Sequence, residues 1–301
     1  MFSRALKITI MNVKRSVLFL LLPLCLASCG EKVEFPVTDD PDLIYLLRNG
    51  DSLQSKATTV NELSIRTNTT DLLKRLEANE PMFVYAHTVF CPACKAAEGA
   101  MVTFLKDSQV QMLSLYNESR DDRTIIDTVE ALRYDYPEVY KAFLHSDGGL
   151  YTPAAVLIKD KEHAYQVSFE ENRANANALE KQFRDLMNLT AVYNFRHLDS
   201  FLSYIEKTDC LFFFETEIKV EEKTVSAFTH HVYDKAIHQS KPVAVLHYAS
   251  LTADEKVTLS ARLANGESTL CGTFTGGKAS VLNYQKSPDQ VPELLTTYYG
   301  A

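Results

Sequence analysis

Residues 82–95 read MFVYAHTVFCPACK, and this stretch decides the fold. Its first five residues form an apolar run with Val and two aromatic side chains, which is typical of a buried β-strand. The CPAC segment at 91–94 follows after a short loop. Pro92 suits the first turn of a helix, because its fixed φ matches that turn and its missing N–H loses no hydrogen bond there. The stretch therefore predicts a strand and then a helix whose first turn carries two cysteines.

The two cysteines have the spacing of a thiol–disulfide exchange site. Unpaired N–H groups and the helix dipole favour a thiolate at a helix N-terminus, so we expect a lowered pKa for the Cys91 thiol. Cys94 lies one turn further on the same side, where it can resolve a mixed disulfide. Lys95 adds a positive charge nearby, and His87 is a candidate for stabilising the thiolate or transferring protons. The alternative for His87 is a surface residue at the end of the strand.

Strands and helices alternate regularly from residue 63 onward. The first series ends near residue 189 with a hairpin and a helix, and the same order recurs over 190–301, where Gly276-Gly277 is a two-residue hairpin signal. We therefore predict two tandem α/β sandwiches with mixed sheets, one domain at 63–189 and a second at 190–301.

Four elements of this prediction rest on periodicity alone. We expect a strand at 63–65, one helical region from Thr124 to about Leu144, a helix that extends through Met187, and another helix at about 225–238.

The segment Phe90–Lys95, placed between a strand and a helix, resembles the thioredoxin superfamily. The resemblance implies a thioredoxin-like first domain that is redox-active without a cofactor. In it, Cys91 is the attacking cysteine and Cys94 the resolving cysteine of a thiol–disulfide oxidoreductase. One departure matters: thioredoxin keeps a buried acid six residues before the first Cys, and that position is Tyr85 here.

The resemblance also implies a substrate-binding surface. In the family, the proline before the final hairpin is cis and lies against the first cysteine. Pro153 takes that role by resemblance, and Thr152 presents its backbone to a peptide substrate beside Phe90. Pro92 and Ala93 form the spacer between the cysteines.

The second domain lacks this chemistry. Ungapped alignment of the matching strands places Lys219 and Glu222 at the two cysteine positions, so we interpret the second thioredoxin-like domain as degenerate. Two other cysteines, Cys210 and Cys271, are expected at opposite ends of paired antiparallel strands. Because that separation exceeds the reach of a disulfide, we predict that both are free and buried.

The first 28 residues have the features of a lipoprotein signal peptide. Four basic residues precede the apolar run 16–27, which is too short to span a bilayer. Leu26-Ala27-Ser28-Cys29 resembles the lipobox of bacterial lipoproteins, which implies lipidation of Cys29 and an extracytoplasmic, membrane-anchored protein of the cell envelope. Residues 29–62 would form the lipid anchor, tether and leader. The alternative is an ordinary signal peptide cut near Ala27.

The amino-acid composition limits the classes of partner that the protein is expected to bind. The chain has 31 Lys and Arg against 39 Asp and Glu, with the basic residues scattered, so it lacks the positive surface that non-specific nucleic-acid binding needs. We expect exported proteins with thiols or disulfides, a redox partner protein and the membrane as partners. Two alternatives stay open: a non-enzymatic binding or transport-accessory lipoprotein, and a metal-binding protein. The second is disfavoured, because a closed zinc site needs four ligands and the sequence has no second C-x-x-C or C-x-x-H.

Overall fold

The computed structural model describes residues 43–167, 176–263 and 267–300. The signal peptide, the lipidation of Cys29 and the tether lie outside the described residues and stay predictions. Every described residue belongs to one compact unit of the chain, which lies within Phe35–Ala301. Within the described ranges, no helix has the length and apolar character needed to cross a bilayer.

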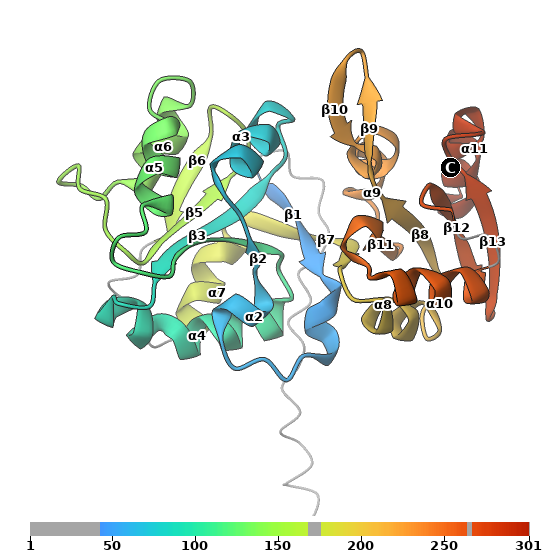
Figure 1. Cartoon of the computed structure of the whole chain (residues 1–301), viewed down its shortest axis with the longest axis horizontal. Helices are drawn as coiled ribbons and strands as arrows, with labels where there is room; N and C mark the ends of the chain where they lie inside the picture. The colour runs from blue at the N-terminus through green and yellow to red at the C-terminus, as the bar shows by residue number, and fades with distance from the viewer. Residues whose placement is uncertain (1–42, 168–175, 264–266, 301) are drawn as a thin grey trace, which may run out of the picture. The chain divides into compact units, whose positions relative to one another are not determined.

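The first mixed sheet contains five strands (Figure 1). Their spatial order is β2 (Ile65–Arg66), β4 (Met112–Asn117), β3 (Met82–Thr88), β5 (Ala154–Ile158) and β6 (Ala164–Val167). β4 runs parallel to β2 and to β3, whereas β5 runs antiparallel to β3 and to β6. The final hairpin predicted from the sequence is therefore present.

Helices cover both faces of this sheet (Figure 1). They are α2 (Val60–Leu63), α3 (Thr69–Glu77), α4 (Pro92–Ser108), α5 (Thr124–Ala131), α6 (Pro137–Phe143) and α7 (Ala176–Arg184). Apolar side chains of α3, α5 and α6 pack with Val84 and Val156 on one face. On the other face, Phe104 of α4 and Phe183 of α7 stack on each other and contact Phe83. This packing holds the first turn of α4 just beyond the carboxyl end of β3.

The second mixed sheet contains six strands. Their order is β1 (Ile44–Asn49), β7 (Met187–Phe195), β11 (Val243–His247), β8 (Cys210–Glu215), β12 (Leu270–Thr275) and β13 (Lys278–Asn283). From β7 to β13 the strand directions repeat those of the first sheet. α8 (Leu198–Ile205) and α10 (Ala253–Leu263) cover one face, while α9 (Asp234–Ala236) and α11 (Val291–Tyr299) cover the other. The predicted α/β class with mixed sheets is confirmed, and the fold is consistent with a thioredoxin-like one.

The predicted domain limits do not coincide with the strands. β1 lies inside the predicted leader 29–62, yet it pairs in parallel with β7 at the edge of the second sheet. The limit between residues 189 and 190 falls inside β7, because the apolar run that begins at Met187 continues the strand rather than the preceding helix. The division into two domains stays a prediction.

Three other predicted elements are wrong in detail. Val60–Leu63 is helical, since the Glu62 carboxylate accepts the Thr58 and Thr59 N–H groups and starts a turn there. Pro137 begins a new helix and separates α5 from α6, because proline cannot continue a preceding helix.

The predicted helix at 225–238 is shorter and starts later. Its first residues belong to the hairpin β9 (Glu217–Val220) and β10 (Lys223–Ser226). Glu221 and Glu222 form the turn of this hairpin with positive φ angles of 46° and 69°. Helical turns follow only at Thr229–Tyr233 and in α9.

Candidate functional site

Cys91 is the residue that begins α4. Its backbone is extended, and its sulfur accepts the backbone N–H of Cys94 at 3.2 Å, as a capping residue does. Pro92 lies in the first helical turn, as the sequence predicts. Both cysteines are free thiols, and Cys91 is half-buried whereas Cys94 is buried. An accessible sulfur therefore precedes a shielded one by a single turn.

The two thiols have opposite pKa shifts. Burial raises the pKa of Cys91, but hydrogen bonds from Cys94 and with Thr152 outweigh this effect, so the net pKa lies below its ordinary value. Burial, together with the hydrogen bond to Cys91, raises the pKa of the Cys94 thiol to about 12. The site thus favours a thiolate at the accessible sulfur and a protonated thiol at the buried one.

The Thr152-Pro153 segment lies against Cys91. Its peptide bond is cis, as the resemblance implies, and Pro153 is buried. The Cys91 thiol donates a hydrogen bond to the Thr152 carbonyl oxygen at 3.0 Å. Residues 61 positions apart in the sequence are therefore brought together at the sulfur.

Exposed apolar side chains occur next to both parts of the site. Phe90 precedes Cys91 and is 47 % exposed, and its neighbour Val89 is 57 % exposed. Tyr151 precedes Thr152 and is 52 % exposed. The Arg120 guanidinium lies over the Phe90 ring, 5.8 Å from its centroid. Of these three exposed residues, only Phe90 was predicted from the sequence to contact a substrate. Val89 and Tyr151 lie in connecting segments, where no periodicity shows which side chains are exposed.

The candidate modulators His87 and Lys95 occupy different environments. His87 is buried between the rings of Tyr85 and Tyr116, and its Nε2 lies 2.8 Å from the Ser114 hydroxyl. It is therefore not the surface residue of the alternative interpretation. Burial lowers the pKa of His87 to about 4, so the imidazole is neutral at pH 7. Lys95 is exposed, and its backbone N–H donates to the Cys91 carbonyl at 3.1 Å.

Tyr85, which stands where thioredoxin has an acid, is fully buried beneath the site. Burial raises the pKa of this phenol, and the nearby Cys94 sulfur raises it further. The interior next to the resolving cysteine therefore contains a neutral phenol in place of a carboxylate.

The second half of the chain offers no equivalent thiol site. Lys219 lies in a strand and Glu222 in a tight turn, so no helix begins at the aligned position. Across the described ranges, no cluster of three His, Cys, Asp or Glu side chains is placed to hold a metal ion.

The remaining two described cysteines are free and buried, as predicted. Cys210 is opposite Phe274 and Cys271 is opposite Phe213 in the β8 and β12 ladder. Phe213, the residue opposite Cys271, is three positions from Cys210 along β8. Three positions along a strand correspond to about 10 Å, which is beyond the reach of a disulfide. Burial raises the pKa of each thiol to about 12, which keeps both protonated.

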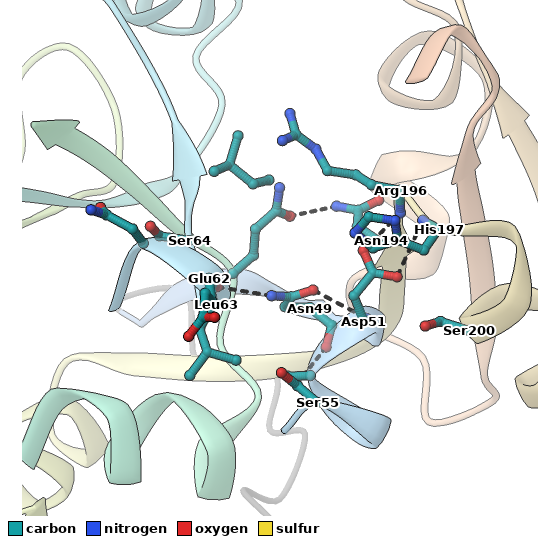
Figure 2. Close-up of a pocket in the computed structure, with 14 residues that line it drawn as sticks. Asn49, Asp51, Ser55, Glu62, Leu63, Ser64, Asn194, Arg196, His197 and Ser200 are labelled. Atoms are coloured by element: carbon teal, nitrogen blue, oxygen red, sulfur yellow. Dashed lines mark hydrogen bonds between the residues drawn. The ribbon is translucent and has the colours of Figure 1, made fainter. Parts of the chain in front are cut away.

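Two cavities in the structure were not predicted from the sequence. The first, of about 390 Å³, is polar (Figure 2). In it the Asp51 carboxylate accepts the backbone N–H groups of Arg196 at 2.9 Å and His197 at 3.3 Å, where α8 begins. Asp51 therefore binds the two residues that precede α8, which come from a distant part of the sequence. A second cavity, of about 370 Å³, lies at the carboxyl ends of the central strands of the second sheet.

No protein-family profile and no curated protein matches the sequence. Two solved structures of ERdj5 are similar over 85 % and 78 % of this chain, at 14 % and 12 % sequence identity, with TM-scores of 0.24 and 0.28. The matched regions span 29 % and 30 % of the ERdj5 chains, so this chain corresponds to less than a third of their length.

Proposed function

We propose that the protein is a thiol–disulfide oxidoreductase that acts on exported proteins through Cys91 and Cys94. The observation that carries the proposal is the accessible Cys91 sulfur with a lowered pKa, at the start of α4 and beside the cis Thr152-Pro153 bond. The exposed side chains of Val89, Phe90 and Tyr151 provide apolar surface for a peptide substrate.

The chemistry proceeds in two balanced steps. The Cys91 thiolate attacks one sulfur of a substrate disulfide, so a mixed disulfide forms and the other substrate sulfur leaves as a thiolate that takes up a proton. Cys94 then loses its proton and attacks the Cys91 sulfur, which releases the second substrate thiol. The substrate gains two electrons and two protons, and the enzyme becomes the Cys91–Cys94 disulfide. The same steps in reverse oxidise a dithiol substrate.

The pKa shifts of the two thiols fit a sequence in which Cys91 attacks first and Cys94 second. The negative charge of Cys91 is one of the causes that raise the pKa of Cys94. When Cys91 enters a mixed disulfide it loses that charge, so the pKa of Cys94 falls as its attack becomes useful. The resolving thiol is therefore held protonated until a substrate is bound covalently.

A redox titration tests the proposal. In buffers of stepped glutathione ratio, we expect the Cys91–Cys94 disulfide to form and break reversibly at a potential between about −300 and −100 mV. Acid-quenched alkylation and mass spectrometry measure the oxidised fraction. A Cys91→Ala/Cys94→Ala variant is the control, because Cys210 and Cys271 remain and should show no transition. A wild-type pair that stays reduced at every ratio would exclude the proposed redox role.

We further propose that the chain is anchored to a bacterial membrane by lipid on Cys29, outside the cytoplasm. Support comes from the lipobox-like Leu26-Ala27-Ser28-Cys29. After expression in a bacterium, the wild-type chain should partition into detergent and incorporate labelled fatty acid, because acyl chains are apolar. A Cys29→Ala variant should do neither. Equal labelling of both chains would contradict lipidation at this residue.

A further inference from the structure

Three ionisable side chains meet at one edge of the second sheet. β7, β11 and β8 are parallel neighbours, so their carboxyl ends lie at the same edge. Leu246 pairs with Phe195, which places His247 beside Arg196, and His247 itself pairs with Glu215. Carboxyl ends of parallel strands are where α/β sheets commonly bind ligands.

The cavity of about 370 Å³ opens at these strand ends, and we call it the strand-end cleft. Ser250 links two of the strand ends, because its hydroxyl lies 3.0 Å from the Arg196 carbonyl oxygen and 2.7 Å from the His247 carbonyl oxygen. Apolar lining is contributed by Leu47, Leu113, Phe228 and Val245. The cleft therefore offers charged and apolar surface together.

Four acidic residues line the cleft, and each already has a partner; Asp71 accepts from the Asn68 side-chain amide at 3.0 Å. Glu80 accepts from the Arg75 guanidinium at 2.9 Å, and Glu217 pairs with Lys74. Glu215 accepts the backbone N–H of Phe228 at 2.8 Å. Burial raises the pKa of Glu215 to about 7, so this carboxyl carries less than a full negative charge near neutral pH.

Two donors of the cleft lack a partner. In the described part of the chain, the Arg196 guanidinium has no ion pair, and Figure 2 shows its side chain extending away from the Asp51 carboxylate. The His247 Nε2 is buried and has no hydrogen-bond partner among the described residues. A buried polar atom without a partner is unfavourable, so a ligand that supplies an acceptor would be stabilised here.

The charges of the residues that line the cleft determine whether an anion or a cation is the favoured ligand. Burial, together with the positive charges of Arg196 and Arg75, lowers the pKa of His247 to about 3. The imidazole is therefore neutral and can donate one N–H, while the Arg196 guanidinium, which has no ion pair among the described residues, opposes a cation. An oxyanion can accept hydrogen bonds from the Arg196 guanidinium and from the His247 imidazole at the same time.

We infer that the strand-end cleft binds a small organic anion, whose oxyanion group lies between the Arg196 guanidinium and the His247 Nε2. Its apolar part packs on Leu47 and Phe228. The second half of the chain, which lacks the cysteine pair, would then supply both hydrogen-bond donors of a binding site that residues of the first half, such as Leu47 and Arg75, help to line. This inference does not depend on the redox chemistry of Cys91.

Binding of three aromatic probes to the full chain tests the inference. Benzoate and phenyl phosphate carry oxyanions of different chemistry, and benzamide is the neutral counterpart of benzoate. We expect at least one anion to bind and to shift the imidazole NMR signals of His247, with benzamide binding about tenfold more weakly or worse. Whichever anion binds more tightly identifies a carboxylate or a phosphate as the natural group.

A pair of arginine variants completes the test. Arg196→Gln should weaken the anion about tenfold, whereas Arg262→Gln, which removes a surface ion pair with Glu206 outside the cleft, should not. Arg196 is exposed, so its replacement leaves the core intact. Failure of both anions to bind, equal binding of benzamide, or unchanged affinity in Arg196→Gln would each overturn the inference.

Discussion

Replacing Cys91 by Ser is expected to slow disulfide exchange with a protein substrate by on the order of a thousandfold or more. A serine hydroxyl is not ionised near neutral pH, so the first covalent bond to the substrate sulfur cannot form at a useful rate. In the wild-type protein the rate should rise with pH through the Cys91 pKa, which lies below its ordinary value, because only the thiolate attacks. Reduction of insulin disulfides, with glutathione as electron donor, measures both effects.

Cys94→Ser should give a different defect from Cys91→Ser. The Cys91 thiolate still attacks, but nothing resolves the mixed disulfide, so enzyme linked to substrate should accumulate and be visible on a non-reducing gel. Cys271→Ala is the matched control, because it removes a buried thiol from the second sheet and should leave the rate unchanged. If Cys91→Ser retained exchange while Cys94→Ser lost it, the roles of the two cysteines would be reversed.

The local part of the site could be predicted from the sequence, because it depends on residues close in the chain. The CPAC segment starts a helix by the capping and N1 preferences of Cys91 and Pro92, and these preferences are local. The contact between Cys91 and Thr152 spans 61 positions and was available only through the family resemblance. The burial of His87 could not be predicted, since it depends on where Tyr116 and Ser114 lie in the neighbouring strand.

The fold shows the same division between local and long-range causes. The hairpin turns at Gly276-Gly277 as predicted, because two residues with positive φ determine the turn. β1 could not be assigned, since β7, the strand that it pairs with in the described part of the chain, lies about 140 residues further along the sequence. The strand-end cleft is also long-range: Arg196, Glu215 and His247 meet only through the register of three parallel strands. Charged residues directly after apolar strands were the only signal in the sequence.

Phe183→Ala is expected to lower the free energy of unfolding by roughly 3 to 5 kcal/mol, the usual cost of emptying a buried aromatic site. Phe183 is fully buried. Its ring lies 4.6 Å from that of Phe104 in a stacked arrangement and 4.7 Å from that of Phe83 at a steep angle. Urea unfolding followed by far-UV circular dichroism is the suitable measurement, because the chain has no Trp to report by fluorescence.

Tyr165→Ala is the control for this measurement. Tyr165 is an aromatic residue of the first sheet but is 37 % exposed on β6, so its loss should cost less than about 1 kcal/mol. A similarly small change for Phe183→Ala would show that α7 does not pack on α4 as described. The expected large change would instead show that the aromatic cluster fixes α4 on the sheet. Because α4 begins at Cys91, the same packing sets where the attacking sulfur lies relative to Thr152.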